Sequence, residues 1–134
     1  MARALQVALG LVVRNLRRGD DASLTLPETS ALQRLERCGP CTQAALARLE
    51  QITPQSMGST IAGLRARGLV ERTDDPSDRR QSLVTITPAG HTALEARRDA
   101  IASRLGAALA SLDDRDREAL AVAAPILLRL AESL

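Results

Sequence analysis

The first feature of the sequence is an apolar stripe near the N-terminus, spaced as on one face of a helix. Its members are Leu5, Leu9, Val12, Val13 and Leu16. The cluster Arg17-Arg18-Gly19-Asp20-Asp21 follows, and its polarity predicts the end of the helix. Because few charges flank the stripe, this helix needs cover from its own domain or from a partner subunit.

Two shorter helices are predicted next, separated by Gly39-Pro40. Pro27 suits the first position of the earlier helix and Glu28 its first turn, where the helix dipole favours an anion. Its expected buried residues are Ala31, Leu32 and Leu35. Thr42 is the expected N-cap of the later helix. The residues expected to be buried there are Ala44, Ala45, Leu46 and Leu49, and Ile52 closes the element.

The clearest helix start is Thr53-Pro54, a hydroxyl cap followed by a proline at the first helical position. Met57, Ile61 and Leu64 then recur at helical spacing, and Gly68 is expected to end the helix. After Gly68 the pattern changes to β-branched runs at residues 69–73 and 82–86, with polar residues 74–81 between them. This predicts a β-hairpin with an eight-residue tip.

Two helices are predicted at the C-terminal end of the sequence. Thr87-Pro88 opens a long helix, and its apolar face holds Leu94, Ile101, Leu105 and Leu109. Asp113 and Asp114 cap the last helix, and its apolar residues are Leu120, Ile126, Leu127 and Leu130. Pro125 lies in the middle of that helix and is expected to kink or split it.

The predicted fold class is mainly α with a small β-hairpin. The order helix, short helix, turn, helix, hairpin is that of a winged helix-turn-helix, whose second paired helix projects into a DNA major groove about 12 Å wide. The hairpin tip then reaches the flanking backbone or the minor groove, where a guanidinium suits the negative potential.

Composition narrows the functions that this fold could serve. The 134 residues fit one compact domain, and they include no Phe, Tyr or Trp, which excludes the RNA-binding sheets that stack bases on aromatic rings. All 18 basic residues are arginines, and His91 is the single histidine. One histidine and two cysteines argue against a metal site, and a Ser-His-Asp system would have to be built around His91. We expect no cofactor. With no secretion signal and no run of membrane-spanning length, we expect a soluble cytoplasmic protein with no membrane partner.

Residues 24–94 resemble the MarR family of bacterial transcription regulators. Four blocks carry the resemblance: residues 42–47 (TQAALA), 64–72 (LRARGLVER), 78–80 (DRR) and 83–90 (LVTITPAG). The resemblance implies a non-enzymatic homodimer that binds a pseudo-palindromic operator on double-stranded DNA. It implies an N-terminal dimerisation helix at 1–19, a DNA-binding domain at 24–90 and C-terminal dimerisation helices at 91–134. Such proteins usually repress, and a small ligand or oxidation releases them from DNA; here an anionic or lipophilic effector is the expectation.

The resemblance also assigns candidate DNA-binding residues. The recognition helix is expected to expose Gln55, Ser56, Ser59 and Thr60. Gln pairs bidentately with adenine, and Ser contacts several base edges or a phosphate. The further candidates are Thr42, Arg65, Arg72, and the wing residues Arg79 and Arg80 with Asp78 orienting one of them. Ser59 stands where many relatives carry Arg, and Ala62 stands where many carry an acid that pairs with the wing.

Charge adds little to this interpretation. Between Thr42 and Ile86 there are six arginines against five acids, a surplus of one positive charge. So small a surplus predicts a shallow salt dependence of non-specific DNA binding. It also leaves open a winged-helix protein that binds another protein instead of DNA.

The tetrapeptide Cys38-Gly39-Pro40-Cys41 has the residues of a thioredoxin active site and supports other hypotheses. A thiol oxidoreductase would need a preceding β-strand, yet residues 29–37 have a helical pattern. A redox switch on the DNA-binding domain needs no such strand. In the simplest interpretation, Gly-Pro separates two helices and both cysteines are small apolar side chains. His91, beside the predicted wing, is interpreted as a solvated residue.

Overall fold

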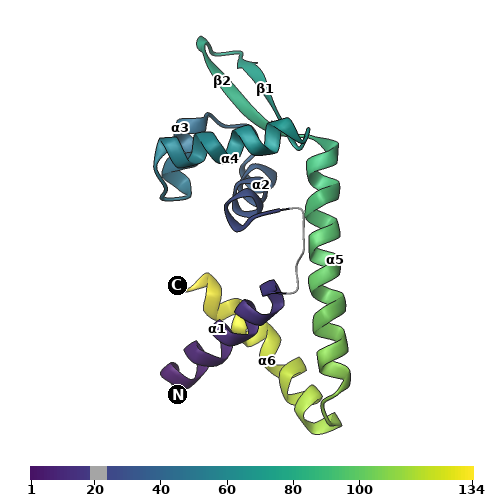
Figure 1. The fold of residues 1–134 in the computed structure, drawn as a ribbon. Helices are drawn as coiled ribbons and strands as arrows, with labels where there is room; N and C mark the ends of the chain where they lie inside the picture. Colours follow the sequence, from purple (N-terminus) through teal and green to yellow (C-terminus); the bar gives the residue numbers. More distant parts are fainter. Residues whose placement is uncertain (19–23) are drawn as a thin grey trace. The chain divides into compact units, whose positions relative to one another are not determined.

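The computed structural model describes residues 1–18 and 24–134 of the chain (Figure 1). The helices are α1 (Ala2–Arg18), α2 (Leu26–Cys38), α3 (Gln43–Leu49), α4 (Pro54–Ala66), α5 (Pro88–Ala110) and α6 (Asp114–Glu132). The strands β1 (Val70–Asp75) and β2 (Asp78–Ile86) form an antiparallel hairpin. The predicted mainly helical fold with one small hairpin is confirmed. The predicted stop at Gly19, Asp20 and Asp21 lies outside the described residues.

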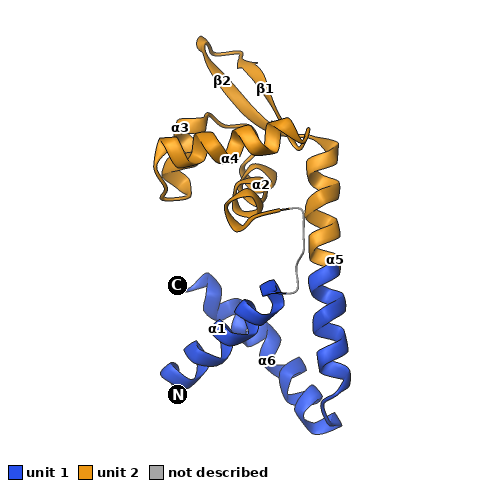
Figure 2. Ribbon diagram, viewed as in Figure 1, with its two compact units in different colours: residues 1–20, 100–134 blue, residues 21–99 orange. Residues whose placement is uncertain are grey.

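Contacts divide the chain into two compact units (Figure 2). Residues 21–99 form what we call the winged-helix unit, and residues 1–20 with 100–134 form the terminal unit. Residues 91–99 therefore belong to the winged-helix unit, whereas the family resemblance groups them with the C-terminal dimerisation helices. The reason is visible in the first turns of α5, where Leu94 is buried in the core of the winged-helix unit.

The core of the winged-helix unit is built from aliphatic side chains of α2, α3, α4, the hairpin and the start of α5. Its largest fully buried members are Leu32, Leu35, Leu46, Met57, Ile61, Leu64, Val70, Val84 and Leu94. Together with Ala31, which is also fully buried, these include the predicted apolar faces of α2 and α4. Periodicity therefore located the sides of both helices that pack inward.

The short helix α3 departs from its predicted pattern. Leu46 and Ala47 are buried, whereas Ala44 and Leu49 are exposed, and Leu49 has 46% of its surface accessible. The helix ends at Leu49, and the chain then reverses through Gln51 at a positive φ of 54°. A side chain in the last turn of so short a helix is carried out of the core by that reversal.

Most of the helix ends follow the predicted capping residues. The Thr42, Thr53 and Asp113 side chains each accept a hydrogen bond from the backbone N–H three residues on, at 3.1, 3.1 and 2.8 Å. At α2 the cap is Thr25, in a capping box with Glu28, so Pro27 occupies the second helical position and not the first. Gly68 follows α4 with φ of 72°, a conformation that glycine adopts without strain.

The hairpin is longer than predicted and its tip shorter. β1 extends to Asp75 and β2 begins at Asp78, so Pro76-Ser77 makes the turn where an eight-residue tip was expected. The register shifts between Asp74, which pairs with Ser82, and Asp75, which pairs with Asp78. Residues 79–81 consequently bulge from the ladder. The sequence shows no alternation of apolar and polar residues at these strand ends, because both faces of the hairpin are solvated there.

Pro125 does not split the last helix, and α6 runs unbroken from Asp114 to Glu132. Proline removes one backbone N–H from the helix, and the remaining turns on either side are long enough to continue. Among the described residues, every helix is too short or too polar to cross a lipid bilayer.

Candidate nucleic-acid interface

Helix α4 presents two distinct rows of side chains. Met57, Ile61 and Leu64 are buried, and the other row carries the predicted reading residues. Gln55, Ser56 and Ser59 are exposed and Thr60 is half-buried. This arrangement follows from the helical period, since the buried row holds the helix against the core and leaves the polar row facing solvent.

Two hydroxyls on the exposed row are already partly engaged. The Thr53 hydroxyl donates to Ser56 Oγ at 2.9 Å, and the Thr60 hydroxyl donates to the Ser56 carbonyl at 3.1 Å. Ser56 keeps its own hydroxyl proton for a partner. Arg65 is exposed in the last turn of the same helix.

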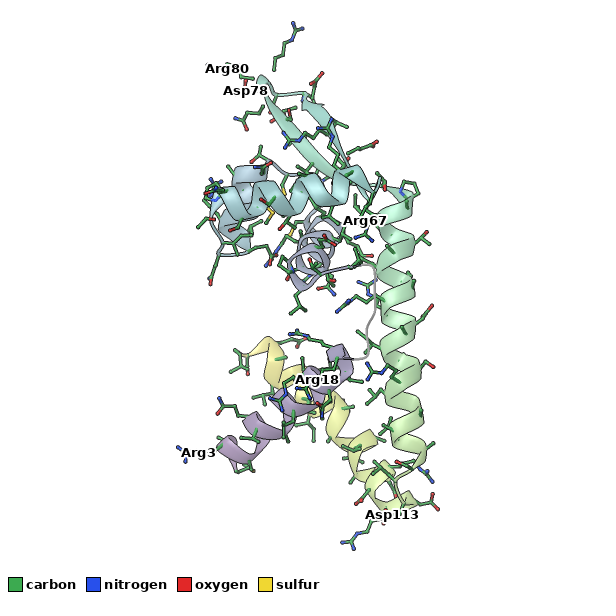
Figure 3. All side chains as sticks on the ribbon, in the orientation of Figure 1. Arg3, Arg18, Arg67, Asp78, Arg80 and Asp113 are labelled. Carbon is green, nitrogen blue, oxygen red and sulfur yellow. The ribbon has the colours of Figure 1, made fainter. Side chains whose placement is uncertain are left out.

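The wing is organised around Asp78 at the start of β2 (Figure 3). One carboxylate oxygen of Asp78 accepts from the backbone N–H of Arg80 at 3.0 Å and from its Nε at 3.4 Å. The other oxygen accepts from Gln81 at 3.2 Å. The Arg80 side chain remains 92% exposed, and Arg79 is exposed beside it. Asp78 therefore holds the bulge in place while both guanidiniums project outward.

Asp75 shapes the other side of the hairpin turn. Its carboxylate accepts from the N–H of Ser77 at 2.9 Å and from the Ser77 hydroxyl at 2.7 Å. These hydrogen bonds lower the pKa of Asp75 below its ordinary value. The turn is thus closed by a carboxylate that stays ionised at neutral pH.

A hollow of about 720 Å³ lies between the start of α3 and the wing. Its lining includes Thr42, Gln43, Arg48, Arg72, Arg80 and Ser82. Arg72 Nη2 donates to Gln43 Oε1 at 2.8 Å. Sequence reasoning named Thr42, Arg72 and Arg80 but missed Gln43, Arg48 and Ser82. The hairpin register could have located Ser82. Val84 is the cross-strand partner of Arg72, and Ser82 lies two residues before Val84, so Ser82 and Arg72 share one face of the hairpin.

Comparisons with known proteins now decide the family. The MarR family model matches residues 24–82. An HTH-type transcriptional regulator of Mycobacterium bovis is 35% identical over 98% of this chain and 93% of its own length. This chain belongs to the MarR family of transcriptional regulators. Regulators of this family are not enzymes, which confirms the non-enzymatic prediction and removes the thiol oxidoreductase alternative.

Solved structures agree with the fold of this MarR regulator. A transcriptional regulator from Pseudomonas aeruginosa superposes with a TM-score of 0.83 at 28% identity, covering 97% of this chain and 92% of the other. Staphylococcus aureus MepR, solved bound to an oligodeoxyribonucleotide, superposes with a TM-score of 0.73 at 16% identity, covering 97% and 96%. The second likeness shows a shared winged-helix fold.

The two cysteines of the MarR regulator lie in different surroundings. Cys38 ends α2 and is exposed, whereas Cys41 is half-buried and exchanges backbone hydrogen bonds with Val84 of β2, at 3.2 and 2.8 Å. Gly39 between them has φ of 76°. Burial raises the pKa of the Cys41 thiol, and the neighbouring Cys38 raises it further. Cys41 is therefore poorly suited to act as an attacking thiolate.

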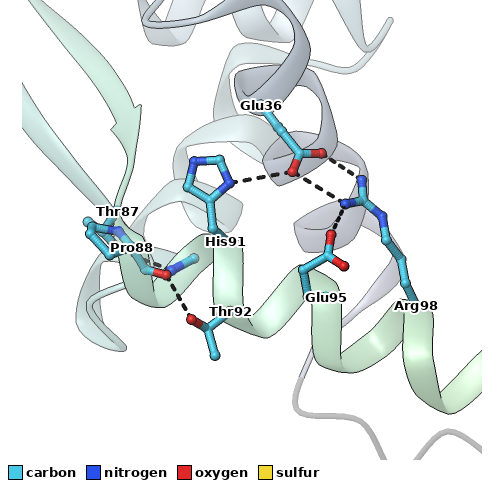
Figure 4. A network of polar contacts seen from close by, with 8 residues as sticks. Glu36, Thr87, Pro88, His91, Thr92, Glu95 and Arg98 are labelled. Carbon is cyan, nitrogen blue, oxygen red and sulfur yellow. Dashed lines mark hydrogen bonds and ion pairs between the residues drawn. The ribbon is translucent and has the colours of Figure 1, made fainter.

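His91 takes part in a polar network between α2 and α5 (Figure 4). Its Nδ1 lies 3.4 Å from Glu36 Oε1, and Arg98 binds the same carboxylate at 2.6 Å. Arg98 holds the pKa of Glu36 below its ordinary value, with a smaller contribution from His91. His91 is exposed, as predicted, but it also contacts an acid that the sequence pattern did not indicate.

Proposed function

We propose that this protein is a homodimeric DNA-binding regulator of a pseudo-palindromic operator. The recognition helix α4 enters the major groove, and Arg79 and Arg80 of the wing reach the flanking backbone or minor groove. The observation that carries the proposal is the exposed polar row of α4 on the same unit as an arginine-bearing wing. The likeness of the fold to MepR, which was solved on an oligodeoxyribonucleotide, supports it.

Base reading in this proposal falls to the exposed row of α4. Gln55 is fully available for a bidentate contact with adenine, and Ser59 is available to base edges or a phosphate. The Ser56 hydroxyl accepts a hydrogen bond from Thr53, and the Thr60 hydroxyl donates one to the Ser56 carbonyl. Because both hydroxyls are held close to the helix, we assign Ser56 and Thr60 to the DNA backbone and not to base edges. Arg65 is a phosphate contact. This helix has Ser59 where many relatives carry Arg, and Ala62 where many carry an acid that pairs with the wing. We therefore assign a large share of the DNA affinity to the wing.

The terminal unit supports the homodimer. Neither α1 nor α6 holds a buried residue in the single chain. Their exposed apolar side chains include Val7, Leu11, Val12, Leu120, Val122, Ile126 and Leu128. Helices so apolar need cover, and a second copy of the same helices supplies it through a self-complementary interface. A two-fold dimer then addresses two half-sites about 10 bp apart.

Repression is the proposed mode of regulation, with DNA released by a small effector. Because the sequence has no aromatic residues and all its basic residues are arginines, an effector site would be lined by aliphatic side chains and arginines. A lipophilic anion is therefore the class of compound to screen first. A second route to release is oxidation of Cys38 and Cys41 by a hydroperoxide. The peroxide oxidises one thiol to a sulfenic acid and is reduced to water or an alcohol; the second thiol then displaces water and forms a disulfide.

Selection of bound sequences from a random duplex pool tests the proposal directly. We expect an enriched inverted repeat, which a labelled titration then confirms with and without hydrogen peroxide. Arg79→Ala and Arg80→Ala should weaken binding to the selected site, and Gln55→Ala should change which bases are preferred. No enrichment, with only weak salt-sensitive binding, would overturn operator recognition and favour a winged-helix module that binds a protein.

A further inference from the structure

Four arginines of the winged-helix unit are held by side chains of other elements, and their partners differ in charge. Arg34, Arg67 and Arg98 pair with the carboxylates of Glu50, Glu28 and Glu36, at 2.8, 3.0 and 2.6 Å. Each of these ion pairs joins two elements and cancels the charge of the arginine. Arg72 is held just as closely, at 2.8 Å, but by the neutral amide oxygen of Gln43. Its position is set while its positive charge is kept.

The backbone explains why Gln43 can reach Arg72. Cys41 forms a reciprocal pair of backbone hydrogen bonds with Val84, and Val84 is the cross-strand neighbour of Arg72. This bridge places the start of α3 against the base of the hairpin, so that Gln43, two residues on, lies beside Arg72. Gly58 of α4 leaves room for the amide, since a Cβ built there would lie 3.1 Å from Gln43 Nε2.

The hollow beside this pair is cationic. Arg48, Arg72 and Arg80 contribute to its wall, and none of its lining residues is acidic. The hydroxyls of Thr42 and Ser82 add hydrogen-bonding groups. Asp78 offsets part of the charge of Arg80 at the rim, which leaves Arg48 and Arg72 as the main cations. A guanidinium fork of this kind matches the geometry of a phosphate.

We infer that this hollow seats a phosphodiester of the operator backbone, with Arg72 as the contacting cation and Gln43 as the residue that positions it. The inference rests on the proposed function, because it assigns a role within the same DNA interface. Gln43 is suited to this role by being neutral. A carboxylate at position 43 would hold Arg72 at least as firmly but would cancel the charge that the phosphate needs.

The test is a titration of the selected duplex at several salt concentrations for four proteins. Arg72→Ala should bind roughly tenfold more weakly and lower the salt slope by about 0.9, as expected for one lost phosphate contact. Gln43→Glu should weaken binding by a similar factor while its thermal midpoint stays at or above that of the wild type. Arg115→Ala is the matched control, since it also removes one positive charge but lies in the first turn of α6.

The outcomes separate the two claims. If Gln43→Glu binds as tightly as the wild type, with an unchanged salt slope, the positioning role is overturned. An ion pair would hold Arg72 as firmly as the amide does, so unchanged binding would mean that the free charge of Arg72 does not matter to DNA. Equal losses in Arg115→Ala and Arg72→Ala would overturn the phosphate seat, because net charge alone would then explain both. A wild-type protein that binds no selected duplex would instead overturn the proposed function.

Discussion

Gly90 shows how one missing methyl group holds two elements together. A Cβ built at this position would lie 2.3 Å from the carbonyl oxygen of Leu69 and 2.7 Å from a side-chain carbon of Ile86. The Leu69 carbonyl belongs to the backbone and cannot move aside without displacing the hairpin. Gly90 therefore allows the first turn of α5 to pack directly against the start of the wing.

We expect Gly90→Ala to lower the free energy of unfolding by roughly 1–3 kcal/mol, because the added methyl overpacks a rigid contact. Urea denaturation measures the change. Gly63→Ala in α4 is the control, since its Cβ would make an ordinary contact of 3.5 Å with Glu28 and helix propensity should raise stability by up to about 1 kcal/mol. Equal effects of both changes would contradict the proposed packing role.

The two thiols should react at different rates. Since burial raises the pKa of Cys41, less of it is thiolate at any given pH than for an ordinary cysteine. At about pH 8, iodoacetamide should modify Cys38 in Cys41→Ser faster than Cys41 in Cys38→Ser, with the rate at Cys41 rising only at higher pH. In urea, where the chain is unfolded, the two cysteines should react at equal rates. Equal rates in the folded variants as well would show that Cys41 is not shielded.

At the scale of elements, α2 and α5 are joined by a carboxylate whose ionisation matters. Arg98 lowers the pKa of Glu36, so the ionised form stabilises the fold at neutral pH. That contribution is fully present above the ordinary carboxylate pKa. It is lost as the pH falls through the lowered pKa of the folded state.

Glu36→Gln should therefore be less stable than the wild type at neutral pH, and the difference should disappear in acid. Urea midpoints between about pH 7 and pH 3 measure this. Glu95→Gln is the control, because Glu95 also binds Arg98, at 2.5 Å, yet its side chain is 61% exposed and better solvated. A constant difference between Glu36→Gln and the wild type at all pH values would contradict the role of ionisation.

The sequence predicted elements well where a local signal exists. Hydroxyl caps before Gln43 and Pro54 and the apolar period of Met57, Ile61 and Leu64 depend on residues close together in the chain. The strand ends at the hairpin tip differ from the prediction because the pairing of Asp74 and Asp75 depends on a two-residue turn and on the hydrogen bonds of Asp75 and Asp78, not on apolar alternation. The capping box of Thr25 with Glu28 is also a local signal, and it places the helix start one residue earlier than Pro27 alone predicts.

The candidate site was only partly predictable, because only some of its residues are placed by signals from residues close together in the chain. Gln55, Ser56 and Ser59 follow from the buried row of α4, since the opposite face of a helix must be exposed. The role of Gln43 does not follow from such a pattern, because its contact with Arg72 depends on a bridge between residues 41 and 84. No periodicity within one element reports a contact across that separation.

At the scale of the whole molecule, the terminal unit is expected to be stable only when covered. Leu128 in α6 has 68% of its surface exposed in the single chain. We expect Leu128→Glu to shift the protein from dimer to monomer in sedimentation velocity, because a charge buried in an apolar interface is strongly unfavourable. Affinity for the selected inverted repeat should fall with it, since the two half-sites would no longer be bound together.

Leu26→Glu is the matched control, because Leu26 is 48% exposed in the first turn of α2, where a negative charge is favourable. It should remain dimeric and bind DNA as the wild type does. A Leu128→Glu protein that still sediments as a dimer would contradict the assignment of α6 to the interface.

The bridge between Cys41 and Val84 has a consequence for the motion of the wing. Its two hydrogen bonds are reciprocal, so the amide protons of both residues are released when the hairpin lifts from the turn before α3. In deuterated solvent these two amides should exchange together, at a rate set by how often the wing undocks. DNA that holds the wing in place should slow both amides by the same factor.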